Sequence, residues 1–126
     1  MNRSVENFSL ALHRFAEALE WEETPATRDS AILRFELCYE TAWKAAQLAA
    51  RNEGLVVSGP RQSFQAALQL GWVQDETVWD AIIRTRNNAI HTYNEDLAKQ
   101  LYNDLPTFRP ALEELLSHIS KGKRDS

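Results

Sequence analysis

Residues 5–19 read Val5-Glu6-Asn7-Phe8-Ser9-Leu10-Ala11-Leu12-His13-Arg14-Phe15-Ala16-Glu17-Ala18-Leu19, and this stretch indicates the fold. Its large apolar side chains recur at steps of three and four residues, at Val5, Phe8, Leu12, Phe15 and Leu19. That spacing is typical of a helix that packs in a bundle and turns its polar side chains to solvent. We therefore expect a helix over 3–22 that ends before Pro25, because proline disfavours the helical conformation of the preceding residue.

The same spacing continues along the rest of the chain. A second helix is predicted over 28–52 from the series Ile32, Phe35, Tyr39, Ala42, Ala46 and Ala49. Further helices are expected to start near Ser58, at a cap formed by Asp75 and at a cap formed by Asn94, with an interruption at Pro106. The prediction is an all-α, up-and-down four-helix bundle with short extra helices. It forms a single domain over 1–120, followed by a flexible tail over 121–126.

Composition limits what such a domain can do. The chain has 126 residues, with 14 Lys and Arg against 18 Asp and Glu, a formal net charge of −4. An acidic protein is a poor general coat for nucleic acid, because binding to phosphates regardless of sequence needs surplus basic residues. Cys38 is the only cysteine, which excludes an intrachain disulfide. The N-terminus lacks a signal-peptide pattern, and no apolar run approaches membrane-spanning length, so we expect a cytoplasmic protein with no membrane contact.

Familiar catalytic and metal-binding motifs are absent from the sequence. It contains no phosphate-binding GxxxxGK[ST] loop, no GxGxxG turn, no HExxH and no GxSxG. Pairs such as Glu22-Glu23 and Asp75-Glu76 point around a helix rather than toward each other, so we interpret them as solvated surface. We therefore expect neither a metal site nor a cofactor.

The stretch 84–93 is different, because it concentrates polar side chains that can bind phosphate. It reads Arg84-Thr85-Arg86-Asn87-Asn88-Ala89-Ile90-His91-Thr92-Tyr93. On a helix, residues seven apart fall within about 20° of each other, which pairs Arg84 with His91 and Arg86 with Tyr93. The structural interpretation is that the arginines form salt bridges and the asparagines end a helix. The functional interpretation is a phosphate site.

RNA cleavage would need few groups at such a site. An RNA strand supplies its own nucleophile, the 2′-hydroxyl, so a nuclease needs a proton-transfer group and a cation but no metal. His91 and Arg86 have those properties, since imidazole titrates near neutral pH and guanidinium binds phosphate oxygens in pairs. A twofold dimer would supply a second histidine.

Three stretches of the chain resemble known families. Arg86-Asn87-x3-His91-x-Tyr93 resembles the R-x4-6-H motif of the HEPN superfamily, in the R-x4-H-x-Tyr form of HepT-like toxins. The stretches 34–44, 59–67 and 86–95 resemble the nucleotidyltransferase substrate-binding proteins, a related family. The likeness extends over about residues 5 to 118.

The HepT-like resemblance implies a homodimeric helical bundle whose motif lines a cleft at the dimer interface. It implies a metal-independent endoribonuclease toxin that acts on RNA, with Arg86 and His91 as catalytic residues and Asn87 as the polar residue after the arginine. Its partner would be a minimal nucleotidyltransferase of the MntA kind, an antitoxin that transfers AMP to Tyr93 (AMPylation). Arg84 also fits the looser motif spacing, and whether it shares the role of Arg86 is left open.

The second resemblance implies a milder function. In that case the chain is a non-catalytic substrate-binding subunit of a two-component nucleotidyltransferase, and Arg86, His91 and Tyr93 bind a small substrate or the nucleotide. The complete nuclease motif favours the toxin, which we take as the first hypothesis. The acidic composition, without a wider basic surface, favours the binding subunit.

Overall fold

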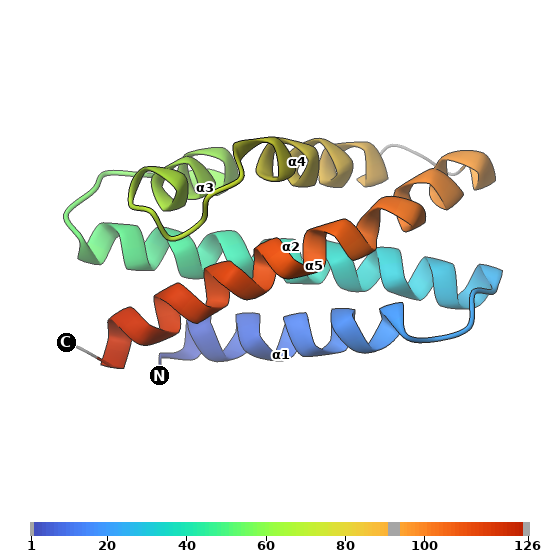
Figure 1. The fold of residues 1–126 in the computed structure, drawn as a ribbon, viewed down its shortest axis with the longest axis horizontal. Coiled ribbons are helices and arrows are strands. Elements are labelled where there is room, and N and C mark those ends of the chain that lie inside the picture. Colours follow the sequence, from blue (N-terminus) through green and yellow to red (C-terminus); the bar gives the residue numbers. More distant parts are fainter. Residues whose placement is uncertain (1, 91–93, 125–126) are drawn as a thin grey trace.

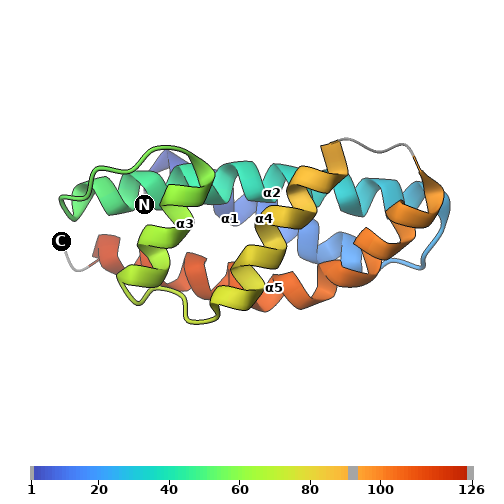
Figure 2. The same cartoon turned by 90° about the horizontal axis from the view of Figure 1, so that it is seen from above.

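The computed structural model describes residues 2–90 and 94–124, and these residues form five helices and no strand. The helices are α1 (Arg3–Leu19), α2 (Pro25–Asn52), α3 (Gly59–Gln69), α4 (Glu76–Ile90) and α5 (Glu95–Arg124). Helices α1, α2 and α5 run along the length of the molecule, and α3 and α4 lie across one side of them (Figures 1 and 2). This is the predicted all-α up-and-down bundle, in which the two shorter helices α3 and α4 together take the place of the third long helix.

The link between the first two helices differs in detail from the prediction. Helix α1 ends at Leu19 rather than at residue 22, and α2 begins at Pro25, about one turn before residue 28. Thr24 and Thr27 form a capping box, in which each side-chain oxygen accepts a hydrogen bond from the other's backbone N–H, at 3.1 and 2.7 Å. Proline fits the first helical position because its missing N–H would have no partner there. Pro25 therefore starts the second helix.

Other helix ends follow from local chemistry, and the predicted caps at Asp75 and Asn94 are confirmed. Gly54 and Gly71 adopt positive φ angles of 90° and 78° after α2 and α3, and the backbone N–H of Trp72 then bonds to Ala67 O at 2.9 Å. Asp75 caps α4 by accepting a bond from the backbone N–H of Val78 at 3.2 Å. Asn94 caps α5 by accepting bonds from the next helical N–H groups at 2.9 and 3.2 Å.

Helix α5 runs through Pro106 and Pro110, so the predicted interruption at Pro106 is wrong. A proline inside a helix lacks an N–H donor and crowds the carbonyl one turn earlier. Both prolines are exposed, so the affected carbonyls lie on the solvent side, where water can bind them. The opposite face, with Leu105, Phe108 and Leu112, is buried and holds the helix in place. The helix continues to Arg124, within the segment predicted to be a tail.

The core is a chain of aromatic rings to which all five helices contribute. The distances between ring centroids are 5.9 Å for Phe15–Phe35, 5.6 Å for Phe35–Phe108, 6.4 Å for Phe35–Tyr39, 5.4 Å for Tyr39–Phe64 and 4.6 Å for Phe64–Trp79. Phe35 of α2 lies at the centre, because it meets rings from both α1 and α5. Pairs of rings at such distances add to the stabilisation that burial itself provides.

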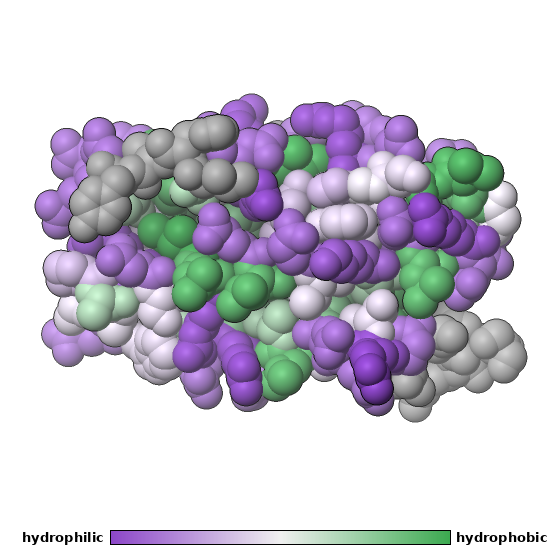
Figure 3. Space-filling view, turned by 180° about the vertical axis from the view of Figure 1, so that it is seen from behind, coloured by the Kyte–Doolittle hydropathy of each residue, from purple (hydrophilic) through white to green (hydrophobic). Residues whose placement is uncertain are grey.

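Figure 3 shows one face of the molecule, on which apolar side chains lie among polar ones. Leu10 of α1 and Leu33 and Leu37 of α2 are 51, 55 and 53% exposed, and they line a shallow groove of about 490 Å³. None of the described helices has the length and apolar character needed to cross a bilayer.

Candidate functional site

Arg86 of the predicted motif lies on α4 and points toward α2. Its Nη2 atom is 3.2 Å from Oε1 of Glu40, and its guanidinium carbon is 5.6 Å from the ring centre of Tyr39. The side chains of Arg86 and Glu40 are 26 and 37% exposed, so water only partly screens their interaction. The ion pair and the ring together fix the position of the guanidinium.

The surroundings of Arg86 change the pKa values of two groups on α2. Burial raises the pKa of Glu36, which lies one turn before Glu40, and the charge of Arg86 partly opposes that change. Burial likewise raises the pKa of Tyr39, with Glu40 adding to the effect, while Arg86 and Arg61 act in the opposite direction. Arg61 belongs to α3, so α2, α3 and α4 all contribute charges to one place. We call Glu36, Tyr39, Glu40, Arg61 and Arg86 the Arg86 cluster.

One donor of Arg86 lacks a partner. Its Nε atom is buried and has no hydrogen-bond acceptor within the described part of the chain. An unsatisfied buried donor is unfavourable by roughly 1–3 kcal/mol. Nε1 of Trp79 in the core is a second buried donor without an acceptor among the described residues, so this feature alone does not separate a functional position from a structural one.

No pattern in the sequence pairs Arg86 with these partners, although they lie in two of the stretches that resemble the nucleotidyltransferase substrate-binding proteins. Glu36, Tyr39 and Glu40 lie in the stretch 34–44, and Arg61 lies in the stretch 59–67. The spacing of Glu36 and Glu40 places both on one stripe of a helix. That spacing predicts that the two carboxyl groups lie on the same side of α2, but it does not predict which helix packs against that side.

The remaining predicted residues are distributed as follows. Arg84 lines a separate pocket of about 300 Å³ between α4 and α5, together with Gln100 and Asp104, so it does not join Arg86. Asn87 is exposed on α4. His91 and Tyr93 lie outside the described residues, and the expected pairs Arg84–His91 and Arg86–Tyr93 remain predictions.

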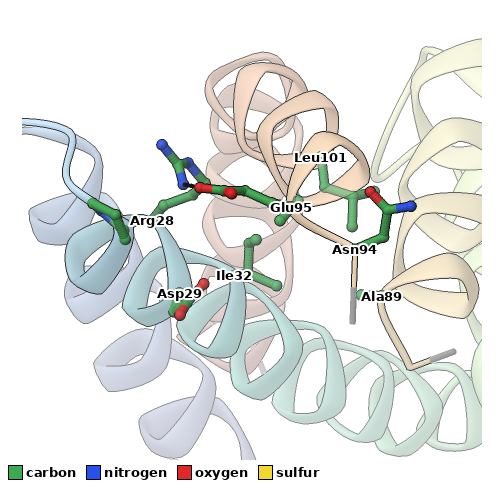
Figure 4. A pocket seen from close by; sticks show the side chains of 9 residues that line it. Arg28, Asp29, Ile32, Ala89, Asn94, Glu95 and Leu101 are labelled. Atoms are coloured by element: carbon green, nitrogen blue, oxygen red, sulfur yellow. Dashed lines mark ion pairs between the residues drawn. The ribbon is translucent and has the colours of Figure 1, made fainter. Parts of the chain in front are cut away.

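A second polar feature lies beside the Arg86 cluster, where α2 begins, α4 ends and α5 begins (Figure 4). It is a pocket of about 330 Å³, which we call the end pocket. Its lining residues are Pro25, Arg28, Asp29, Ile32, Ala89, Asn94, Glu95, Ala98 and Leu101. In the sequence, Ala89 and Asn94 lie before and after the segment that contains His91 and Tyr93. Both residues line the pocket, so the predicted motif is next to it along the chain.

The end pocket and the Arg86 cluster occupy adjoining turns of the same two helices. On α2, Ile32 of the pocket comes one turn before Glu36 of the cluster, and on α4, Arg86 comes one turn before Ala89. The two features therefore adjoin each other along the contact between α2 and α4, with the apolar residues Ile32 and Ala89 between them.

Arg28 is the most buried charged group in the end pocket, with only 7% of the residue exposed. Its Nε atom donates to Oε2 of Glu23 at 3.1 Å, and its Nη1 atom is 3.9 Å from Oε1 of Glu95. The second distance is too long for a hydrogen bond. Polar groups at the rim and the apolar side chains of Ile32 and Leu101 inside make this a typical small-molecule pocket.

Within the described ranges, we find no group of three or more His, Cys, Asp or Glu side chains placed to hold a metal ion. Cys38 is fully buried in α2, and burial raises the pKa of its thiol. Since the thiolate is the reactive form, Cys38 is a structural residue.

Comparisons with known proteins agree with this fold. No curated protein matches the chain. A crystal structure of a Thermus thermophilus protein superposes with a TM-score of 0.82 and 33% identity, covering 89% of this chain and 98% of that one. A Haemophilus influenzae protein superposes with a TM-score of 0.80 and 19% identity, covering 92 and 98%. Its structure is described as revealing the fold of a substrate binding domain of a nucleotidyltransferase, and at this identity the likeness shows the fold alone.

A family comparison is more specific. Residues 3–121 match the family described as nucleotidyltransferase substrate binding protein like, so the match extends over nearly the whole chain. The chain therefore belongs to this family of nucleotidyltransferase substrate-binding-like proteins.

Proposed function

We propose that the chain is the helical substrate-binding partner of a separate nucleotidyltransferase. The end pocket is the observation that carries this proposal, because it combines an apolar interior with a few polar groups in a volume of about 330 Å³. Substrate binding is also named in the description of the family and in that of the Haemophilus influenzae structure. In this role the chain holds a small substrate in position, and the partner enzyme transfers a nucleotidyl group to it.

The electrostatics of the Arg86 cluster support binding of a small substrate. The charge of Arg86 is largely offset by Glu40 at 3.2 Å, and the carboxyl group of Glu36 lies within its electrostatic reach. Affinity for an RNA strand depends on several uncompensated cations along the backbone. A small substrate needs only one or two positioned polar groups, and a paired arginine can supply them.

A homodimer belongs to this proposal, as the family resemblance implies. Two copies related by a twofold axis would carry two end pockets and two motif segments. Light scattering of the purified chain should then give twice the mass of one chain, and a monomer at micromolar concentration would contradict this part.

Enzyme assays with the nucleotidyltransferase expected beside this gene test the proposal directly. We expect little transfer by the enzyme alone and clearly faster transfer when the chain is added at equimolar concentration. The variant Ile32→Glu places a charge in the apolar part of the end pocket, and it should remove the stimulation while circular dichroism shows an intact helical fold. Equal transfer with and without the chain would contradict the proposal.

A second candidate function is the RNase toxin, which the complete motif Arg86-Asn87-x3-His91-x-Tyr93 favours. In this case His91 takes the proton of the RNA 2′-hydroxyl while its oxygen attacks phosphorus, and Arg86 stabilises the negative charge on the phosphate oxygens. The bond to the 5′-oxygen breaks, and this oxygen leaves with a proton from His91 of the second copy in the dimer. Neutralisation would proceed by attack of the Tyr93 hydroxyl on the α-phosphorus of ATP, with pyrophosphate leaving. The attached AMP would block RNA by charge and bulk.

Expression of the chain without its partner separates the two functions. The toxin hypothesis predicts growth arrest that His91→Ala relieves, because loss of a general acid or base slows a reaction by ~10²–10⁴-fold. It also predicts RNA cleavage that persists in EDTA. The binding-subunit proposal predicts normal growth and no cleavage.

A further inference from the structure

We infer that the end pocket takes a small molecule that carries a protonated amine beside an aliphatic or ring-shaped body. This inference rests on the proposed function, since such a molecule would be the substrate that the chain holds. It concerns only residues of α2, α4 and α5 that the structure describes.

The body of the ligand follows from the interior of the pocket. Ile32 of α2 and Leu101 of α5 face the same space, with Pro25, Ala89 and Ala98 completing the apolar part. Leu101 is only 7% exposed, so it gives the pocket a firm apolar wall. A highly charged or fully polar ligand would lose hydrogen bonds to water at this surface and form none in their place. A hydrocarbon body would bind more favourably here, because its apolar surface is removed from water.

The charge of the ligand follows from the balance of charged groups at the rim. Asp29 and Glu95 both line the pocket, and Arg28 is the single cation among the lining residues that the structure describes. Arg28 is already paired with Glu23 at 3.1 Å, whereas the Glu95 side chain is 68% exposed and lies 3.9 Å from Nη1. Asp29 takes part in none of the ion pairs that the described residues form. The described lining side chains thus carry one more negative charge than positive charge.

The two carboxylates also have a favourable arrangement. In the view of Figure 4, the Arg28–Glu95 ion pair lies on one side of Ile32 and the Asp29 carboxylate on the other. An amine attached to a body seated on Ile32 can therefore reach a carboxylate at the rim while the body stays in contact with the apolar wall. A carboxylate or phosphate in the same place would be repelled by Asp29 and Glu95.

Three probes with the same ring separate these possibilities: cyclohexylamine, cyclohexanol and cyclohexanecarboxylate. Each is titrated into the isotopically labelled chain alone, and backbone amide shifts are followed by NMR. We expect the amides around Arg28–Ile32 and Glu95–Leu101 to move with every probe whose ring enters the pocket. The amine should bind more tightly than the alcohol, by up to about fivefold, which is the scale of one exposed ion pair.

The variant Asp29→Asn tests the charge, and Asp80→Asn is its matched control. Both aspartates are exposed and lie about one turn into their helices, α2 and α4, but Asp80 does not line the end pocket. We expect Asp29→Asn to weaken the amine severalfold without changing the affinity for cyclohexanol. Asp80→Asn should leave both affinities unchanged.

Several results would overturn the inference. Tighter binding of the carboxylate than of the amine would make this an anion site controlled by Arg28, and equal loss in both variants would exclude a specific role for Asp29. No shift at the pocket amides with any probe would exclude the site. These measurements use the chain alone, so their failure leaves the stimulation of the nucleotidyltransferase, which tests the proposed function, as a separate result.

Discussion

Glu40 holds Arg86 against α2 at a distance of 3.2 Å, and this contact occupies Nη2 of the motif arginine. A guanidinium with a neighbouring carboxylate and a tyrosine ring in place presents a fixed set of N–H donors. At the residue scale, the electrostatic balance around Arg86 is therefore the property to test.

Replacing Glu40 by Gln should destabilise the fold by about 1 kcal/mol, because it leaves the partly buried Arg86 without its charged partner. Urea denaturation followed by circular dichroism measures this change. Glu113→Gln is the control, since Glu113 forms a more exposed pair with Arg109 at 3.7 Å. Equal effects of the two substitutions would show that the Arg86–Glu40 pair has no special weight.

Glu36 predicts a pH dependence of stability. Burial raises the pKa of Glu36 above its ordinary value of 4.5. Between pH 4.5 and the raised pKa, this carboxyl group therefore binds its proton more tightly in the folded protein than in the unfolded chain. Stability is therefore lost as the pH rises from about 4.5 through the raised pKa. Glu36→Gln removes this loss, and we expect a higher melting temperature than wild type at neutral pH.

The comparison should be made across pH by thermal melting. Below pH 4.5 the wild-type carboxyl group is protonated in both states, so its difference from Glu36→Gln should shrink. A variant that is less stable than wild type at neutral pH would show that attraction to Arg86, rather than burial, dominates at this position.

At the scale of the elements, α5 shows how tertiary packing overrides a local signal. Pro106 and Pro110 both lie inside it, yet the helix is continuous because its other face packs Leu105, Phe108 and Leu112 into the core. Proline in a helix interior is unfavourable by about 3 kcal/mol relative to alanine, and burial of large apolar side chains offsets a penalty of that size.

Pro106→Ala should therefore stabilise the protein. Alanine restores an N–H donor to the exposed stripe and removes the crowding, while the greater freedom of the unfolded chain opposes part of the gain. We expect a net increase of about 1 kcal/mol, visible as a higher urea midpoint with unchanged slope. A lower midpoint would mean that the local geometry at Pro106 contributes to packing.

The helix ends show which parts of the fold can be predicted from sequence. Asp75, Asn94, Gly54 and Gly71 act through bonds to residues a few positions away, so their roles were predictable. Pro25 was harder, because proline can follow one helix or begin the next. The contact of Arg86 with Glu40 depends on how α4 packs against α2, and no local pattern contains that information.

At the scale of the whole molecule, the up-and-down arrangement brings together residues that are far apart in sequence. The start of α2, the end of α4 and the start of α5 meet at one end of the bundle and enclose the end pocket (Figure 4). The Arg86 cluster continues from it along α2 and α4. Arg84 lines the pocket between α4 and α5 instead. Arg84 and Arg86, which are only two residues apart in the sequence, therefore lie on different sides of α4.

The acidic composition is consistent with this arrangement. The formal net charge is −4, and the described part of the predicted motif contains an arginine that is already paired. A pocket for a small molecule needs no broad basic surface, whereas binding of a long RNA strand depends on one. The whole-molecule picture therefore favours a protein that presents a substrate to a partner enzyme.

The central claim is that the chain acts as an unmodified partner of a nucleotidyltransferase. Co-expression of the two proteins, followed by size-exclusion chromatography and intact-mass spectrometry, tests it most directly. We predict that the chain elutes together with the enzyme and that its mass equals that of the unmodified sequence. A chain that elutes separately, or one that carries AMP on Tyr93, would contradict this account.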